Sequence, residues 1–354
     1  MVRPVDSGPQ VSNDAPMNKY LRYFGGFALL LIVIGLMLPS RAHIEREIEI
    51  DAHAATIFAL LNDFRQINRW SRWMDADPNI RVDISGPLRG EGASMSWDGQ
   101  IIGQGRQTIV ESVPFTSISS TLGAGEQENA TSTYLLTESS AGTLVVWSYE
   151  REFGFNLAGR YFSLMLDGIV GPEHERDLQS LKELAENMPG ADFSELEIEQ
   201  IVVEAVDIAY FRTSSIPAAA AISEAMGRAY FEVLSFIDEQ NLKEAGAPLS
   251  ITRTFSGSEL VFDAGIPVRG VSSNTPRSAT PVKIGATYAG PVVRVKHIGP
   301  YRNLGRTHDK IAAYLAAVGI ERNGDAWESY VSDPARTNED RLLTYVYYPI
   351  RSQE

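Results

Sequence analysis

The sequence of 354 residues contains no cysteine and only five histidines. Without cysteine, disulfide bonds, thiol catalysis and thiolate-bound metal sites are all excluded. The histidines are scattered and none forms an HExxH-like pair, so we expect no protein-bound catalytic metal. A GxSxG nucleophile motif, a P-loop and a GxGxxG turn after a strand are also missing. We therefore predict no metal, no cofactor and no catalytic residue from these motifs.

Basic residues are also in short supply. The chain has 31 Lys and Arg against 45 Asp and Glu, a formal net charge of −14. Phosphate recognition needs clustered Lys and Arg, so this balance argues against a nucleic-acid partner. The acidic balance is compatible with cationic ligands, although net charge mainly reports solubility. The composition, 44% hydrophobic and 21% charged, is that of a globular protein, and the length suggests two domains.

A long hydrophobic run occurs once, at residues 23–40, after a polar tail at residues 1–22. As a helix this run would be about 27 Å long, close to the ~30 Å of a bilayer core. Two interpretations compete, an uncleaved transmembrane anchor and a signal peptide cut after Ala42. The polar tail and Arg41 at the cut site favour the anchor. The plain alternative to both is a buried helix of the protein core. A slight Lys/Arg excess before the run places the soluble part on the outer (periplasmic or extracellular) side.

Alternating and helical patterns follow this segment. Isoleucines alternate with charged residues at 43–51 and predict a strand, and 54–62 predicts a short helix. Several strand-like runs separated by glycine turns come next. A long helix is predicted from Gly159 to about Asn187, with Pro172 kinking or splitting it. One strand, short helices, an antiparallel meander and a long closing helix predict an α+β fold of the helix-grip type.

The run IDAHAATIFALLNDFRQINRWSRW resembles the opening of the polyketide cyclase/dehydrase branch of the START-like (SRPBCC) superfamily. The later runs SGPLRGEGASMSWDG, LVVWSYE and GRYFSLMLDGIVG also resemble that branch, which predicts a START-like domain over residues 43–188. The resemblance implies an apolar cavity between the sheet and the long helix. Core packing is the more frequent role of a single aromatic residue, and no acid–base pair stands out. Our candidates for the cavity lining are Trp70, Trp73, Trp97 and Tyr161.

An internal repeat organises the remainder of the chain, after a linker near residue 190. The runs LVFDAGIPV (260–268) and LLTYVYYPI (342–350) are two strand-like segments with the same proline-apolar ending. Before each lie a strand, a helix and a strand in the same order. With only two copies, this is a duplicated domain, and we predict it over residues 195–351.

The runs HIGPYRNL, WESYVSDP and TYVYYPI in this layout resemble the GyrI-like family, which includes effector-binding domains fused to AraC-type regulators. The resemblance implies binding of amphipathic cationic or multi-ring molecules in a cleft with a buried Glu and aromatic walls. Some members are reported as hydrolases of strained-ring compounds. By position, Glu328 matches the acid of the family's Glu-x-Tyr segment and Tyr301 the aromatic of its Gly-x-Tyr segment. Many members carry another Glu where this chain has Tyr345, which argues against a doubly charged ligand.

The residues themselves support an acid among aromatic rings. In a strand, Glu328 and Tyr330 share one face, and a carboxylate beside rings suits an organic cation. The plain alternative is an edge strand whose Glu is solvated. Tyr345 and Tyr347 also share a face, with Tyr348 on the opposite one. The ligand-binding candidates are Glu328, Tyr330, Tyr301, Tyr345, Tyr347 and Trp327.

Three functions stay open at this point. The first is a membrane-anchored, non-enzymatic protein that binds a hydrophobic or amphipathic small molecule, for which we expect a cation. The second is an enzyme, either a hydrolase of small reactive ring compounds or a cyclase. The third is a lipid-handling envelope protein. The sequence favours binding over catalysis and leaves the ligand's identity and the oligomeric state open.

Overall fold

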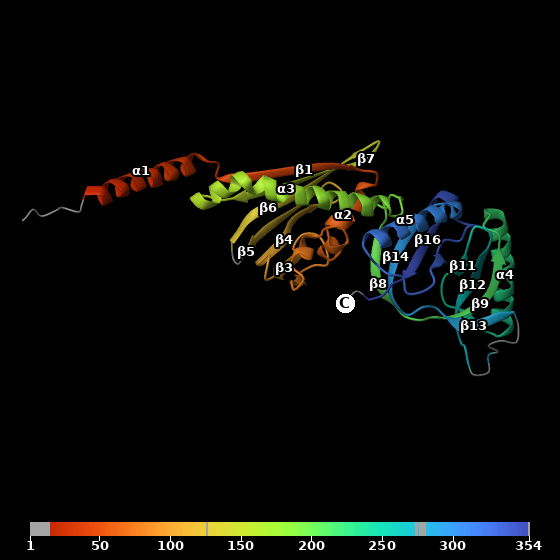
Figure 1. Cartoon of the computed structure of the whole chain (residues 1–354). Coiled ribbons are helices and arrows are strands. Elements are labelled where there is room, and N and C mark those ends of the chain that lie inside the picture. The colour runs from red at the N-terminus through yellow and green to blue at the C-terminus, as the bar shows by residue number, and fades with distance from the viewer. Residues whose placement is uncertain (1–14, 125–126, 273–274, 276–280, 353–354) are drawn as a thin grey trace, which may run out of the picture. The chain divides into compact units, whose positions relative to one another are not determined.

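The computed structural model describes residues 15–124, 127–272, 275 and 281–352, which form two compact units (Figure 1). The polar tail predicted for residues 1–22 lies outside the described residues as far as residue 14. Each unit is built from three stretches of sequence. The first contains residues up to Glu49, Ile67–Ser139 and Leu144–Lys182, and the second contains Ile50–Gln66, Ser140–Thr143 and the residues from Glu183 onward.

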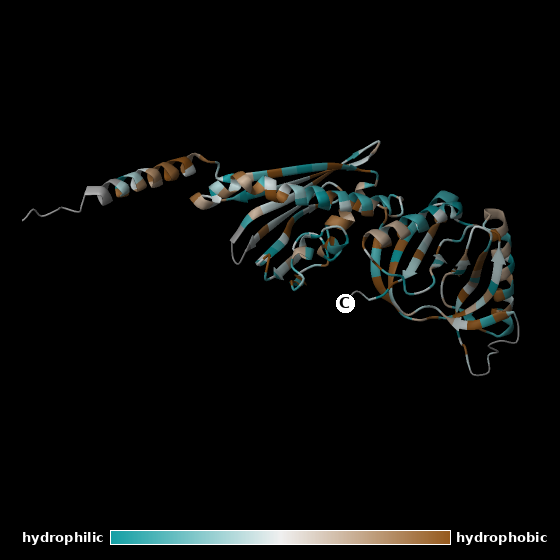
Figure 2. Cartoon of the chain, in the orientation of Figure 1, coloured by the Kyte–Doolittle hydropathy of each residue, from teal (hydrophilic) through white to brown (hydrophobic). Residues whose placement is uncertain are grey.

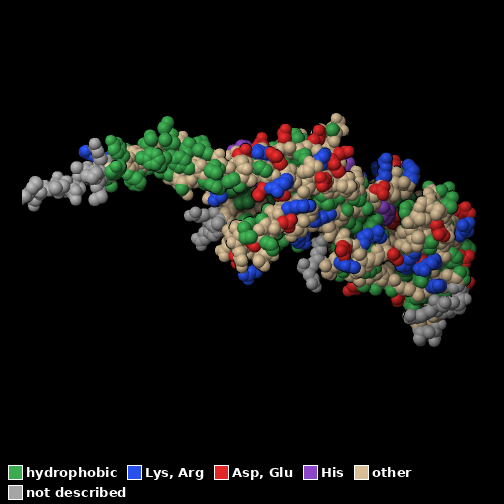
Figure 3. Space-filling view, in the orientation of Figure 1, with side chains coloured by type: hydrophobic (Ala, Val, Ile, Leu, Met, Phe, Trp, Pro, Cys, Tyr) green, Lys and Arg blue, Asp and Glu red, His purple; other side chains and the backbone are tan. Residues whose placement is uncertain are grey.

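The chain begins with α1 (Ala15–Met37), whose segment Tyr20–Met37 is long and apolar enough to cross a membrane. Almost every residue of that segment is exposed, whereas a core helix of a globular protein would be mostly buried. Hydrophobic side chains cover α1 in the space-filling view (Figure 3). The helix therefore fits a membrane anchor or a signal sequence, and the core-helix reading is wrong.

The first unit is a seven-stranded sheet in the order β1-β7-β6-β5-β4-β3-β2, with the 30-residue α3 against it. Leu166 of α3 packs with Ala42 and Ile44 of β1. The helix runs through Pro172 without a break, so the predicted split does not occur. The elements are β1 Arg41–Ile50, η1 Phe64–Arg69, η2 Trp73–Ala76, β2 Arg81–Ser85, β3 Ser94–Asp98, β4 Gln104–Val113, β5 Ser117–Ala124, β6 Gln127–Ser139, β7 Gly142–Glu152 and α3 Leu157–Glu186.

The second unit contains the duplicated part of the chain and α2 (Ala54–Leu61), which packs on α5. Gln66, just after α2, donates a hydrogen bond to the carbonyl of Val318 at the end of α5 (2.9 Å). The other elements are β8 Ile198–Val203, β9 Asp207–Ser215, α4 Ala219–Glu239, β10 Lys243–Glu244, β11 Leu249–Phe255, β12 Leu260–Arg269, β13 Val282–Ala286, β14 Gly290–Ile298, η3 Tyr301–Asn303, α5 Leu304–Ala317, β15 Trp327–Tyr330, η4 Glu339–Arg341 and β16 Leu343–Pro349.

The repeat seen in the sequence reappears as symmetry of the sheet. The strand order is β13-β9-β12-β11-β15-β16-β14-β8, with β10 paired to β12. From the β13 end, the edge strand is followed by the first, last and middle strands of the first repeat copy, β9, β12 and β11. From the β8 end, the edge strand is followed by the corresponding strands of the second copy, β14, β16 and β15. The middle strands of the two copies, β11 and β15, meet antiparallel at the centre, where Ser250 lies opposite Glu328. The two-copy arrangement predicted from the sequence is present, and the α+β fold predicted for the whole chain is confirmed.

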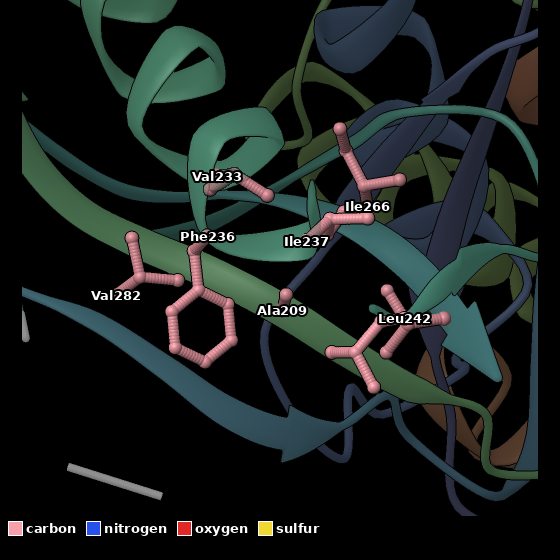
Figure 4. Packing of buried hydrophobic residues seen from close by; sticks show 8 residues of the cluster. Ala209, Val233, Phe236, Ile237, Leu242, Ile266 and Val282 are labelled. Carbon is pink, nitrogen blue, oxygen red and sulfur yellow. The ribbon is translucent and has the colours of Figure 1, made fainter. Parts of the chain in front are cut away.

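The core of the first repeat copy in the second unit lies between α4 and the sheet (Figure 4). Val233, Phe236 and Ile237 project from one face of α4 toward Ala209 of β9 and Ile266 of β12. All five side chains are almost fully buried. Apolar positions three and four apart in α4 and two apart in the strands are what such a two-layer core requires.

Candidate functional site

Glu328 lies in the middle of the second unit's sheet. It is opposite Ser250 of β11 on one side and Val346 of β16 on the other. Strand alternation gives Glu328 and Tyr330 the same face, and Trp327 the opposite one. Its side chain is only 16% exposed. The plain alternative of a solvated edge acid therefore does not describe this residue.

Both carboxylate oxygens of Glu328 accept hydrogen bonds. Oε1 lies 2.7 Å from Nε2 of His308, and the Tyr330 hydroxyl donates to Oε2. Among the described residues, no Lys or Arg forms an ion pair with this carboxylate. The charge of Glu328 is thus met by one histidine and one hydroxyl, and no permanent cation is committed to it.

His308 links the acid to a second tyrosine. Its Nδ1 lies 2.7 Å from the hydroxyl of Tyr348 on β16. Because a carboxylate only accepts, Nε2 carries a hydrogen, and in the neutral ring Nδ1 accepts from the tyrosine. Burial raises the pKa of Tyr348 to about 12, so this hydroxyl stays protonated. The guanidinium of Arg322 lies over the same tyrosine ring, 4.9 Å from its centre.

Two further tyrosines complete what we term the Glu328 cluster. Tyr230 of α4 donates a hydrogen bond to the Leu249 carbonyl (3.0 Å), and its pKa is raised by burial and by the charge of Glu328. Tyr301 packs edge-on against Tyr330 with ring centres 5.3 Å apart. Burial raises the pKa of both these rings as well. The cluster consists of Glu328, His308, Tyr230, Tyr301, Tyr330 and Tyr348.

The other three ligand-binding candidates lie on the opposite face of the sheet. Trp327 stacks on Tyr347 with ring centres 4.6 Å apart and planes nearly parallel, and Tyr345 lies beside Tyr347. The guanidinium of Arg294 sits over the Tyr345 ring. The six candidates therefore divide into two groups of three. One group is Glu328 with Tyr330 and Tyr301, and the other three candidates lie away from the acid.

Sequence reasoning missed His308, Tyr230 and Tyr348 as members of the cluster. Alternation along β16 correctly separates Tyr348 from Tyr345. Only the register between β15 and β16 shows which of the two faces carries Glu328. His308 and Tyr230 come from helices whose approach to the central strands has no signature in the sequence.

A second buried acid, Asp263 of β12, serves as a contrast on the same sheet. Its side chain is completely buried, and Arg212 donates to both of its oxygens (2.6 and 2.9 Å). Arg253 adds a third bond (2.7 Å) and also bridges to Asp325. Burial alone raises the pKa of the Asp263 carboxyl, but the two arginines outweigh it and lower the pKa below its ordinary value.

In the first unit, Trp70 belongs to a buried aromatic cluster. Its ring meets those of Tyr134 and Trp147 edge-on, and these two are stacked 5.0 Å apart. His174 of α3 stacks on the other side of the set, with its centre 3.6 Å from that of Trp147. The Trp147 indole nitrogen donates to Ser132 (2.8 Å), so the polar edge of this ring is satisfied.

Two titratable groups adjoin this aromatic cluster, and burial shifts the pKa of each toward its neutral form. His174 is buried, and Nδ1 has no hydrogen-bond partner within the described ranges; burial together with the charge of Arg46 lowers its pKa to about 4. One turn further on, Asp177 accepts a hydrogen bond from the Ser71 hydroxyl (2.5 Å). Burial raises the pKa of this carboxyl.

The other cavity candidates lie apart from Trp70. Trp73 and Trp97 contact each other edge-on, 5.1 Å between ring centres. Trp97 lies across Gly105 of β4, where any Cβ atom would collide with the indole. Tyr161 instead lies against α1, and its hydroxyl donates to the Leu31 carbonyl (2.7 Å). The described residues contain no group of three or more His, Asp or Glu that could hold a metal ion.

Two family models match the chain in its two parts. Residues 41–186 match the model described as polyketide cyclase / dehydrase and lipid transport. Residues 196–351 match the model described as a GyrI-like small molecule binding domain. No curated protein matches the chain.

Several solved structures resemble parts of the chain in fold. The EcmrR C-terminal domain is 12% identical over 45% of this chain and 99% of its own, with a TM-score of 0.37. A hydrolase from Listeria innocua is 14% identical over 44% of this chain and 91% of its own, with a TM-score of 0.32. The di-domain ARO/CYC StfQ of the steffimycin biosynthetic pathway is 13% identical over 41% of this chain and 51% of its own, with a TM-score of 0.31.

Proposed function

Because the chain joins a domain of the polyketide cyclase/dehydrase and lipid transport family to a GyrI-like small-molecule-binding domain, we propose that it is a membrane-anchored ligand-binding protein. The ligand is an amphipathic organic cation, and it binds at the Glu328 cluster. Glu328 carries this proposal, because its largely buried carboxylate has hydrogen-bond partners but, in the part of the chain that the structure describes, no permanent counter-ion.

The physical basis is the combination of one negative charge with several ring faces. A charge held away from water costs free energy unless it is paired, and a ligand cation supplies that pair. The rings of Tyr301 and Tyr330 add an attraction for the cation of about 0.5–2 kcal/mol. The cluster contains a single acid, since Val346 lies beside Glu328 on β16. A singly charged ligand with several rings is therefore the expected class.

A binding measurement on the full chain in detergent tests this role. The probe is tetraphenylphosphonium, compared with the neutral triphenylphosphine oxide. Replacing the carboxylate in Glu328→Gln should weaken the cation at least about tenfold, or ~1.4 kcal/mol, and leave the neutral probe unchanged. The control Glu244→Gln removes an exposed acid of β10 and should change neither affinity. Equal affinity of the wild type and Glu328→Gln for the cation would refute the role of the acid.

One observation favours a second function. The 2.7 Å contact between His308 and Glu328 is the arrangement that orients a histidine for proton transfer. This supports hydrolysis of small reactive ring compounds as the alternative. Incubation with a panel of epoxides and mass spectrometry of the products decides between the two. Recovery of every compound intact would remove the hydrolase, whereas turnover lost in His308→Gln would support it.

The first domain and α1 complete the proposal. The exposed apolar helix is the anchor, and the basic residues before it favour placing both domains on the outer side of the membrane. The family match of this domain supports a hydrophobic ligand, and the aromatic cluster around Trp147 is where we place it. Mass spectrometry of small molecules that co-purify with the full chain tests this second ligand. Its loss in Trp147→Ala, with the fold retained by circular dichroism, is the expected result.

A further inference from the structure

The end of α1 is fastened to the start of α3 by a buried arginine. Arg160 is 8% exposed, and its guanidinium donates to two carbonyls in the last turn of α1, to one just after α1 and to one in the loop before α3. A cation at a helix C-terminus satisfies carbonyls that have no partner within the helix. The acceptors are Gly35 (3.4 Å), Leu36 (2.9 Å), Leu38 (3.1 Å) and Gly154 (2.8 Å).

A second contact reaches deeper along α1. The Tyr161 hydroxyl bonds to the Leu31 carbonyl, and Gly35 lies so close to Leu157 and Tyr161 that a Cβ atom there would touch both. The last two turns of α1 are thus held against the first turns of α3. Cleavage after Ala42 would remove all the α1 carbonyls that Arg160 binds and cut β1 after its second residue. The packing therefore supports retention of α1.

These contacts place part of α3 at membrane depth. Leu31 lies six residues before Met37, where the apolar segment ends, which is about 9 Å along a helix. If α1 spans a bilayer, a residue bonded to Leu31 lies below the membrane surface. The beginning of α3 then has lipid, not water, around its outer face.

The exposed side chains of α3 change character along the helix in the way this position requires. In the first half, Phe162, Leu164, Met165 and Ile169 are large, apolar and exposed, and the preceding Phe155 is 89% exposed. From Pro172 onward the exposed positions are mainly charged or polar, and no large apolar side chain of this half is exposed. In Figure 2 the half of α3 nearer α1 is browner than the other.

We propose that Phe155 and the first half of α3, residues 157–170, form a membrane-contacting surface that lies in the lipid interface beside α1. The occupant of this surface is the bilayer that α1 enters, because the two helices are joined by the Arg160 and Tyr161 contacts. Exposed aromatic and aliphatic residues on one side of a helix suit the boundary between headgroups and acyl chains. This inference rests on the membrane anchor of the proposed function and adds a second point of attachment.

Single introduced cysteines test the surface, because the natural chain has none. The full chain is reconstituted in phosphatidylcholine–phosphatidylglycerol vesicles, with a fluorescent label at one position at a time. Lipids brominated on the acyl chains report contact with the membrane, and iodide reports contact with water. The anchor position is Leu30→Cys, the test positions are Phe162→Cys and Met165→Cys, and the matched controls on the same helix are Glu173→Cys and Gln179→Cys.

We expect the labels at 162 and 165 to be quenched by bromolipid at least about twofold more than those at 173 and 179, with the opposite order for iodide. Bromolipid quenching at Leu30 alone, with the two test positions in water, would overturn the surface and leave the anchor in place. If the label at Leu30 is also in water, both the anchor and the surface are refuted. Circular dichroism of each labelled chain verifies that the fold is kept.

Discussion

Two buried acids on one sheet differ in the partners that the fold gives them. Asp263 is bound by two arginines, which satisfy both oxygens and hold it ionised. Glu328 is bound by a histidine and a tyrosine hydroxyl, neither of which carries a permanent charge. An acid with committed counter-ions has a structural role, whereas an acid without them retains the capacity to pair with a ligand. The difference teaches that burial alone does not mark a binding acid.

The largest effect is expected from Asp263→Asn. This change leaves Arg212 and Arg253, which are 51% and 33% exposed, without the buried carboxylate that they share. Because the remaining charges reach solvent, we expect the lower part of the cost of breaking a buried ion pair, about 3–4 kcal/mol of unfolding free energy. Urea denaturation of the wild type and the variant measures the loss. Asp325→Asn is the matched control, because Asp325 binds the same Arg253 at an exposed position and is worth less than about 1 kcal/mol. Equal losses in both variants would contradict the structural role of Asp263.

A pH titration extends the comparison to the first domain, where Nδ1 of His174 has no hydrogen-bond partner among the described residues. Its pKa of about 4 when folded lies below the ordinary 6.5, so the unfolded chain takes up the proton first as the pH falls. Stability is complete above pH 6.5 and declines toward pH 4 by roughly 3 kcal/mol. The readout is the difference from His174→Phe, which keeps a ring on Trp147 but cannot titrate. The same pH slope in both proteins would contradict the assignment.

His308, the histidine beside Glu328, allows the environment of Asp263 to be copied at Glu328. His308→Arg places a permanent cation beside Glu328 and so gives it the partner that Asp263 has. Affinity for tetraphenylphosphonium should fall at least about tenfold, equivalent to ~1.4 kcal/mol, because the ligand must displace the arginine. His308→Gln is the control, since it retains a neutral donor. Unchanged affinity in His308→Arg would show that the cation does not bind at this carboxylate.

The smallest effect is expected for the stability of Glu328→Gln. Glutamine keeps the size of the side chain and removes a charge that has no permanent partner. The free energy of unfolding without ligand should change by less than about 1 kcal/mol, in either direction. Thermal unfolding in parallel with Asp263→Asn makes the comparison direct. A loss as large as that of Asp263→Asn would assign Glu328 to the structural acids.

Much of the architecture could be predicted from the sequence because it depends on local periodicity and on the repeat. Alternation and turn residues indicated the strands, and the matching endings at Pro267 and Pro349 indicated the duplication. Alternation also paired Glu328 with Tyr330, and the Tyr330 hydroxyl does bind that carboxylate. These features share one property, since each follows from neighbours within a few residues or from comparison of two stretches of sequence.

The membership of the Glu328 cluster could not be predicted in the same way. Alternation within β15 already separates Trp327 from Glu328, but only the register of β15 against β16 puts Tyr345 and Tyr347 on the face of Trp327 and Tyr348 on the face of the acid. Tyr161 is an aromatic residue of the kind that lines cavities, but its hydroxyl donates a hydrogen bond to a carbonyl of α1. A one-residue change of register would exchange the two faces, and only long-range strand pairing specifies it.

The sequence by itself determined the duplication and the apolar helix, because these are properties of composition and periodicity, and its resemblance to two known families indicated the two domains and the acid of the Glu-x-Tyr segment. Tertiary structure alone decided that Glu328 meets His308 while Asp263 meets two arginines, and that α3 starts beside the end of α1. Such pairings join residues far apart along the chain. Their energies depend on distances and burial that exist only once the strands and helices have packed.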